Sequence, residues 1–168
     1  KSRITSGFFV SVTQAVDIPV MGHYAGSGMF YEGAISGMSP PIALGRLPRL
    51  CGAYIVMINT PYGGYPLQRL KYLQTAHALA LPWRGLRPVL PSVGGGVHPG
   101  LAERFIKDLG KDIILAPGGS VQGHPDGATA GATAMRQAID AVMEGIPLQE
   151  AAKQHKELKT SLDLWGIW

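Results

Sequence analysis

Two glycine-rich segments carry the residue types best suited to bind an anion. They are Gly94–Gly100 (GGGVHPG) and Pro117–Ser120 (PGGS). A phosphate binds where several backbone N–H groups point at one spot, and a Cβ atom obstructs that approach. Glycine also occurs wherever a turn needs a positive φ, so one segment alone would be weak evidence. The two together predict a phosphate site whose amides come from Gly95, Gly96, Gly118 and Gly119.

Histidine is the second residue type with chemistry to offer, because it exchanges protons near neutral pH. His23 closes an apolar stretch and is a candidate general acid or base. The alternative is a histidine that is hydrogen-bonded beneath the site, and position alone leaves both open. His98 and His124 each precede a proline and are expected to be structural. No spacing of histidine, cysteine and carboxylates forms a recognisable metal site.

Several other side chains have simpler explanations. Cys51 is the single cysteine, which excludes an internal disulfide and suits a reducing compartment. It is interpreted as a small apolar residue at a helix end. Asp126 is expected to cap the helix that starts near Gly127. Trp165 and Trp168 are expected to pack the C-terminal segment onto the domain or onto another subunit.

The elements that must position these residues alternate between strand and helix. Continuous apolar runs are typical of buried parallel strands. They predict strands over Ile18–His23, Ala53–Ile58, Pro88–Val93 and Lys111–Ala116. Helices are predicted over Gly7–Val16, Pro40–Leu50 with a kink at Pro48, Pro66–Ala80, Leu101–Leu109 and Ala128–Glu144. A last amphipathic stretch covers Leu148–Leu158.

Polar or glycine-rich residues follow every predicted strand, whereas the strand interiors are apolar. The four sets are His23-Tyr24, Asn59-Thr60 with Pro61–Tyr65, Gly94–Gly100, and Pro117–Ser120. In parallel α/β folds the ligand lies at the carboxyl ends of the strands, so these residues should share one face. Half of an eight-stranded barrel and a small open doubly wound sheet both fit this pattern.

Composition limits the class of protein. The chain has 168 residues, 46% of them apolar, and a net charge of +4. This balance excludes disorder, and the apolar runs are too short to span a bilayer. The basic residues form no dense run, so a nucleic-acid partner is not expected and a small anionic substrate fits the charge. No signal-peptide pattern opens the chain, and we expect a soluble, cytoplasmic protein without a membrane partner.

Both glycine segments resemble turns of a known family. Pro91–Gly100 (PSVGGGVHPG) and Pro117–Ala128 (PGGSVQGHPDGA) resemble the turns after barrel strands seven and eight of RuBisCO and RuBisCO-like proteins. Gly22–Ala25 (GHYA) resembles the segment that ends strand five. The resemblance covers nearly the whole chain. It implies that residues 1–168 are the C-terminal half of a TIM-type (β/α)8 barrel, with C-terminal helices from about 147.

The resemblance also implies roles for particular residues. Gly96, Gly118 and Gly119 match backbone phosphate ligands, with Gly95 beside them. His23 matches a histidine near the reacting carbons that is implicated in proton transfer. In addition, Thr60 matches a threonine that follows strand six.

Departures from the family pattern point away from carbon dioxide fixation. Tyr24 and Met57 stand where carboxylating enzymes have arginine and histidine for a second phosphate. Gly64 stands where their mobile loop carries a lysine, and Gly94 replaces a serine. The resemblance therefore implies the non-carboxylating, type IV branch, whose members enolise sugar phosphates with magnesium as isomerases, enolases, or decarboxylases and transcarboxylases.

This branch implies an isomerase or lyase that acts as a homodimer or larger homo-oligomer, with Mg²⁺ as cofactor. The family's magnesium ligands lie upstream of this segment, so we expect a fragment of a longer polypeptide and no metal ligands in this chain. Two alternatives stay open. One is a non-catalytic sugar-phosphate-binding or assembly module. The other is a phosphate-binding barrel enzyme such as an aldolase, although Lys111 begins its strand and points to the opposite face.

Overall fold

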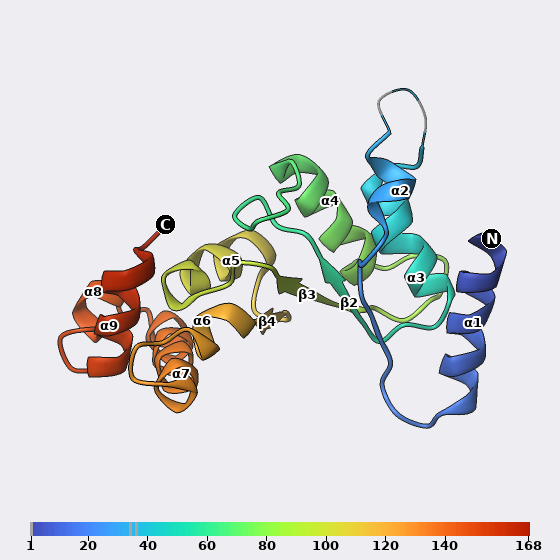
Figure 1. Ribbon diagram of the computed structural model, residues 1–168. Helices are drawn as coiled ribbons and strands as arrows, with labels where there is room; N and C mark the ends of the chain where they lie inside the picture. Colours follow the sequence, from blue (N-terminus) through green and yellow to red (C-terminus); the bar gives the residue numbers. More distant parts are fainter. Residues whose placement is uncertain (1, 34, 36) are drawn as a thin grey trace. The chain divides into compact units, whose positions relative to one another are not determined.

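The computed structural model describes residues 2–33, 35 and 37–168, with side chains from residue 9 onward. Its residues form two compact units (Figure 1). Unit 1 comprises Lys1–Pro61 and Pro66–Val93, and unit 2 comprises Tyr62–Tyr65 and Gly94–Trp168. None of the helices in this described part of the chain is both long and apolar enough to cross a lipid bilayer.

Parallel strands form the centre of unit 1. Strand β1 (Met21–Gly22) pairs with β2 (Ile55–Ile58), which in turn pairs with β3 (Leu90–Gly94). This confirms the predicted α/β class with parallel strands. The first strand is shorter than predicted because Pro19 has no N–H to donate to a ladder. The carbonyl of Val20 extends the pairing by accepting from Tyr54 N at 3.0 Å.

The helices of unit 1 are α1 (Ser2–Ala15), α2 (Gly28–Tyr31), η1 (Pro41–Arg46), α3 (Leu47–Leu50) and α4 (Arg69–Ala80). The predicted single helix over Pro40–Leu50 is two segments, a π-helix and a short α-helix. Helix α3 continues directly from η1, and Pro48 has no N–H to donate to a carbonyl of the preceding turn. The N–H of Leu47 instead reaches back to Ile42 O across the wider π turn.

Unit 1 is held together by α4, η1 and an arginine buried beneath them. Helix α4 packs against η1 and β2 and buries Tyr72 and Leu79 completely. The Arg49 side chain is only 3% exposed. Its guanidinium donates four hydrogen bonds of 2.6–3.2 Å to the carbonyl oxygens of Ala78, Leu81, Leu86 and Arg87. This one side chain therefore fixes both the end of α4 and the approach to β3.

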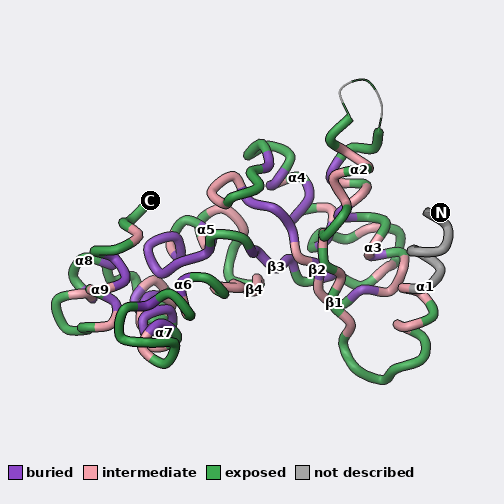
Figure 2. The backbone as a smooth tube through the Cα atoms, viewed as in Figure 1, coloured by how far each residue is buried: buried purple, intermediate pink, exposed green. Residues whose placement is uncertain are grey.

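Unit 2 is built around a long central helix, α7 (Ala128–Glu144). Its other elements are η2 (Pro99–Leu101), α5 (Ala102–Leu109), β4 (Ile114–Ala116), α6 (Gly118–Gln122), α8 (Leu148–Ala151) and α9 (Lys156–Trp165). Helix α7 contacts α5, α6, α8 and α9, and its inner face is buried (Figure 2). At Gly131 a Cβ atom would overlap the backbone of Val121, so this glycine allows α6 to lie directly on α7.

The prediction for α7 is confirmed from end to end, and Gly145 ends it in the left-handed conformation at φ 75°. The amphipathic stretch Leu148–Leu158 falls on two helices, α8 and α9. Helix α8 ends at Ala151, and α9 begins after His155. The extended backbone of His155 interrupts the helix between them. The apolar residues of α8 and α9 follow one rough helical period, so the sequence pattern does not show where one helix ends and the next begins.

Candidate functional site

The two glycine segments lie side by side in unit 2 and are joined by a buried hydrogen bond. The hydroxyl of Ser120 donates to the carbonyl oxygen of Val97 at 2.8 Å. Ser120 is the third residue of α6, and Val97 follows the Gly95-Gly96 turn. Sequence reasoning missed Ser120, because a serine after two glycines is also common in ordinary turns.

Backbone conformation accounts for the first pair of glycines. Gly95 and Gly96 have φ values of 77° and 89°, which favour glycine whatever the ligand. Gly96 is also crowded, since a Cβ atom there would lie 3.1 Å from the Cα of Gly63. The fold alone therefore requires glycine at Gly96, and its type is no evidence for a phosphate.

The second pair of glycines has no such explanation. Gly118 and Gly119 are the first residues of α6, neither has a positive φ, and a Cβ atom on either would meet nothing within 4 Å. Helix N-termini leave their first amides without intrahelical acceptors. This holds for the N–H groups of Gly118 and Gly119, the first two residues of α6. The role of Gly95, Gly96, Gly118 and Gly119 as phosphate ligands stays a prediction.

His23 belongs to unit 1, directly after β1, and its side chain is exposed. Its Nδ1 accepts a hydrogen bond from the backbone N–H of Ala25 at 2.9 Å. In a neutral imidazole this places the proton on Nε2. The ring stacks on Tyr24, with centroids 4.8 Å apart and planes at 22°. His23 is thus prepared to donate a proton from Nε2 rather than to accept one there.

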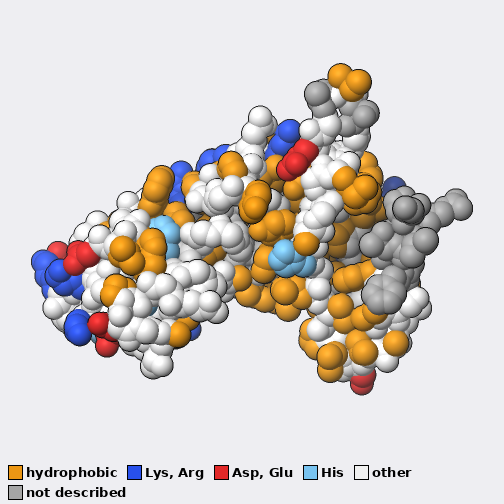
Figure 3. All heavy atoms as spheres, viewed as in Figure 1, with side chains coloured by type: hydrophobic (Ala, Val, Ile, Leu, Met, Phe, Trp, Pro, Cys, Tyr) orange, Lys and Arg blue, Asp and Glu red, His pale blue; other side chains and the backbone are white. Residues whose placement is uncertain are grey.

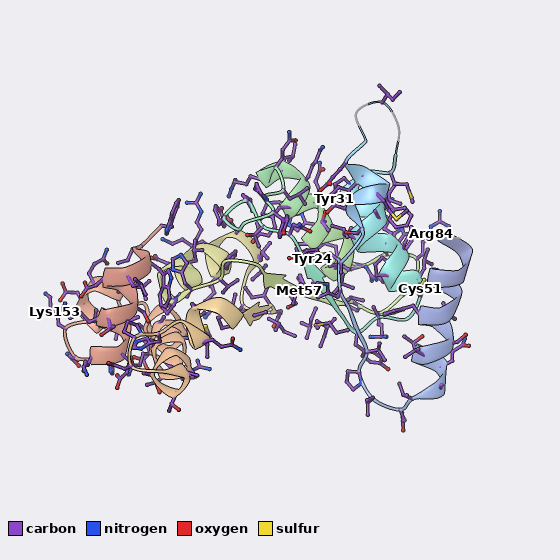
Figure 4. All side chains as sticks on the ribbon, in the orientation of Figure 1. Tyr24, Tyr31, Cys51, Met57, Arg84 and Lys153 are labelled. Atoms are coloured by element: carbon purple, nitrogen blue, oxygen red, sulfur yellow. The ribbon has the colours of Figure 1, made fainter. Side chains whose placement is uncertain are left out.

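A largely apolar cavity of about 640 Å³ opens beside His23 within unit 1. His23, Tyr24 and Ser27 supply polar groups, and most of the remaining wall is apolar, including Met29 and Phe30. Figure 3 shows that apolar side chains also gather on the visible surface of unit 1. Tyr24 and Met57, the positions of two family departures, both lie in unit 1 and are half-buried (Figure 4).

The other two turn histidines are buried in unit 2, as expected of structural residues. His98 is 8% exposed, its ring lies 6.4 Å from that of Trp165, and burial lowers its pKa. His124 accepts the backbone N–H of Asp126 on Nδ1 at 3.0 Å, and its Nε2 lies 3.1 Å from Glu157 O. The predicted packing is therefore confirmed for Trp165, whereas the side chain of Trp168 is 71% exposed.

The predicted cap at Asp126 is wrong. Gly127 occupies the N-cap position of α7 and makes no side-chain cap bond. The Asp126 carboxylate lies 3.1 Å from Lys156 Nζ instead. Cys51 does sit at a helix end, as the C-cap of α3, and burial raises the pKa of its thiol.

Among the residues that the structure describes, no group of three or more histidine, cysteine, aspartate or glutamate side chains gathers in a way that could hold a metal ion. Lys111, the lysine considered for Schiff-base chemistry, precedes β4 rather than following a strand. Asn59 and Thr60 follow β2 and are buried, and Tyr31 Oη lies 3.4 Å from Asn59 Oδ1.

Residues 72–165 match the family of ribulose bisphosphate carboxylase large chains, catalytic domain. The chain belongs to this family. The RuBisCO-family chain is 40% identical to 2,3-diketo-5-methylthiopentyl-1-phosphate enolase of Geobacillus kaustophilus, over 92% of its own length and 37% of that enzyme. It therefore spans little more than a third of this relative.

Solved structures agree with this assignment. A rubisco-like protein from Alicyclobacillus acidocaldarius superposes with a TM-score of 0.84 at 39% identity, over 89% of this chain and 38% of that protein. Octameric ribulose-1,5-bisphosphate carboxylase/oxygenase from Pyrococcus horikoshii superposes with a TM-score of 0.86 at 35% identity, over 96% and 38%. The α/β fold with its parallel strands is therefore that of RuBisCO-like proteins.

Proposed function

We propose that this chain supplies the phosphate-anchoring part of a non-carboxylating RuBisCO-like enzyme that enolises a sugar phosphate. The Ser120–Val97 hydrogen bond carries the proposal, because it brings the two glycine turns together. Gly118 and Gly119 add the second argument, since neither packing nor backbone conformation requires glycine there. Amides from both turns then converge on one phosphate. Glycines at the N-terminus of a helix have no Cβ atom to obstruct the approach of a phosphate to the N–H groups.

The side chains at the family departures favour a substrate with one phosphate. A second phosphate needs cationic or strongly donating groups, and Tyr24 and Met57 offer neither a positive charge nor a fork of donors. Gly64 offers no charge for a carboxylated intermediate. An alkylthio diketone phosphate, like the substrate named for the Geobacillus enzyme, fits these features.

In the reaction we propose, a base removes a carbon-bound proton beside a carbonyl and produces an enediolate. His23 donates a proton from Nε2 to an oxygen of this species, since Ala25 N–H occupies Nδ1. The glycine amides keep the phosphate in place while charge develops elsewhere on the substrate. This assigns the chain to isomerase or lyase chemistry.

The family resemblance implies magnesium, which when bound would stabilise the developing oxyanion. Among the described residues, no group of metal-ligating side chains fits this ion. We further propose a cytoplasmic homo-oligomer, since the similar Pyrococcus horikoshii enzyme is octameric. Neither a nucleic acid nor a membrane is proposed as a partner.

The test is the affinity of the chain for inorganic phosphate, measured by calorimetry for wild type and Gly119→Asp. The carboxylate would occupy the open space at the start of α6, where a negative charge is otherwise well tolerated. Like-charge repulsion at short range should weaken phosphate binding at least about tenfold. Gln122→Glu adds the same charge at the exposed far end of α6 and should change the affinity much less. Equal affinity in wild type and Gly119→Asp would refute the assignment.

A further inference from the structure

The loop Tyr62–Tyr65, which follows β2, is attached to helix α5 by a network around one tyrosine. The hydroxyl of Tyr62 donates to Asp108 Oδ2 at 2.7 Å and accepts from Arg104 Nε at 2.9 Å. The Tyr62 ring packs edge-on against the fully buried Phe105, with centroids 5.7 Å apart. All of these residues belong to unit 2.

The charges in this network make the anchor strong. The Asp108 side chain is only 3% exposed, although it carries a carboxylate. A buried carboxylate needs donors, and the Tyr62 hydroxyl supplies one directly. The Arg104 guanidinium lies 5.4 Å from the centre of the Tyr62 ring, and its Nε is 4.0 Å from Asp108. Losing the hydroxyl would therefore remove hydrogen bonds to two charged groups at once.

The loop that Tyr62 anchors lies against the first glycine turn. The Cα of Gly63 is 3.1 Å, and Tyr62 O is 3.6 Å, from the point where Gly96 would carry a Cβ. Gly96 has a φ of 89° and supplies one of the amides assigned to the phosphate. Any displacement of the loop therefore removes the backbone that supports this turn.

We propose that Tyr62 is a positioning residue. It holds the loop Tyr62–Tyr65 against the Gly95-Gly96 turn and so preforms the phosphate site. This inference rests on the proposed phosphate role of that turn. Because helix α5 already holds this loop in place, the loop does not have to become ordered when the ligand binds. Less conformational entropy is therefore lost on binding.

The experiment compares wild type with Tyr62→Phe, which keeps the ring on Phe105 and removes only the hydroxyl. Tyr65→Phe is the matched control, because the same change falls on a 79% exposed tyrosine of the same loop. The first measurement is the rate at which chymotrypsin cleaves after residue 62, where both Tyr and Phe are accepted. The second is the dissociation constant for inorganic phosphate, measured by calorimetry.

We expect Tyr62→Phe to be cleaved about tenfold faster and to bind phosphate about tenfold more weakly, while Tyr65→Phe changes neither. An unchanged cleavage rate would show that Tyr62 is not the anchor, whether or not phosphate binds. Faster cleavage with unchanged phosphate affinity would overturn the positioning role alone. A wild-type chain that binds no phosphate would overturn the proposed function and the positioning role together, while the cleavage rates would still report on the anchor.

Discussion

The hydroxyl of Ser120 lies 2.8 Å from the carbonyl oxygen of Val97, and both groups are buried. Ser120 lies in α6, which follows β4, whereas Val97 belongs to the turn that follows β3. A single hydroxyl therefore fixes the spacing of the two segments whose amides are assigned to the phosphate.

Ser120→Ala should lower the free energy of unfolding by about 1–3 kcal/mol, because the buried Val97 carbonyl loses its donor. Phosphate affinity should fall as well, since the two turns are no longer linked. Ser161→Ala is the matched control. Ser161 is 1% exposed, and within the described residues its hydroxyl has no hydrogen-bond partner, so its loss should be neutral or stabilising. Equal urea midpoints for the two variants would contradict this account of Ser120.

Arg49→Met should destabilise the chain by at least about 3 kcal/mol, because several carbonyl oxygens lose charged donors inside unit 1. Arg46→Met provides the comparison. Arg46 is exposed and lies 5.3 Å from the centre of the Trp83 ring, so its loss should cost less than about 1 kcal/mol. Chemical denaturation measures both. A cost for Arg49→Met no larger than that for Arg46→Met would show that the four hydrogen bonds contribute little.

Stability should fall as the pH drops below about 6.5, in part through His98. Burial lowers the pKa of His98 from 6.5 in the folded chain, so the unfolded chain binds more protons across this range. Stability then rises with pH and is lost on acidification through the unfolded pKa. His98→Gln removes this contribution. Its unfolding free energy should therefore decline less than that of wild type between pH 7.5 and 5.5, and parallel declines would contradict the assignment.

The sequence predicted the elements with a strong period best. Helix α7 combines one continuous apolar face with a glycine stop, and both of its ends were predicted correctly. Helix α6 was not predicted, because its first two residues are glycines, which have low helix propensity. Strand β1 was predicted too long, because the prediction followed the apolar run and did not weigh the missing N–H of Pro19.

In the candidate site too, local features could be predicted from the sequence and long-range contacts could not. The glycine turns were recognisable from composition and order, but their attachment through Ser120 and Val97 depends on contacts 23 residues apart. Tyr62 and Asp108 are separated by 46 residues, and no local pattern connects them. Tertiary contacts of this kind become visible only in the folded chain.

The central claim is that amides from both turns bind one phosphate, and the most direct test is an amide NMR titration of the ¹⁵N-labelled chain with inorganic phosphate. The account predicts that the resonances of Gly95, Gly96, Gly118 and Gly119 shift together along one saturating curve. The amides of Gly145 and Gly166, at the ends of α7 and α9, should stay in place. Shifts confined to one turn, or absent from all four glycines, would contradict the claim.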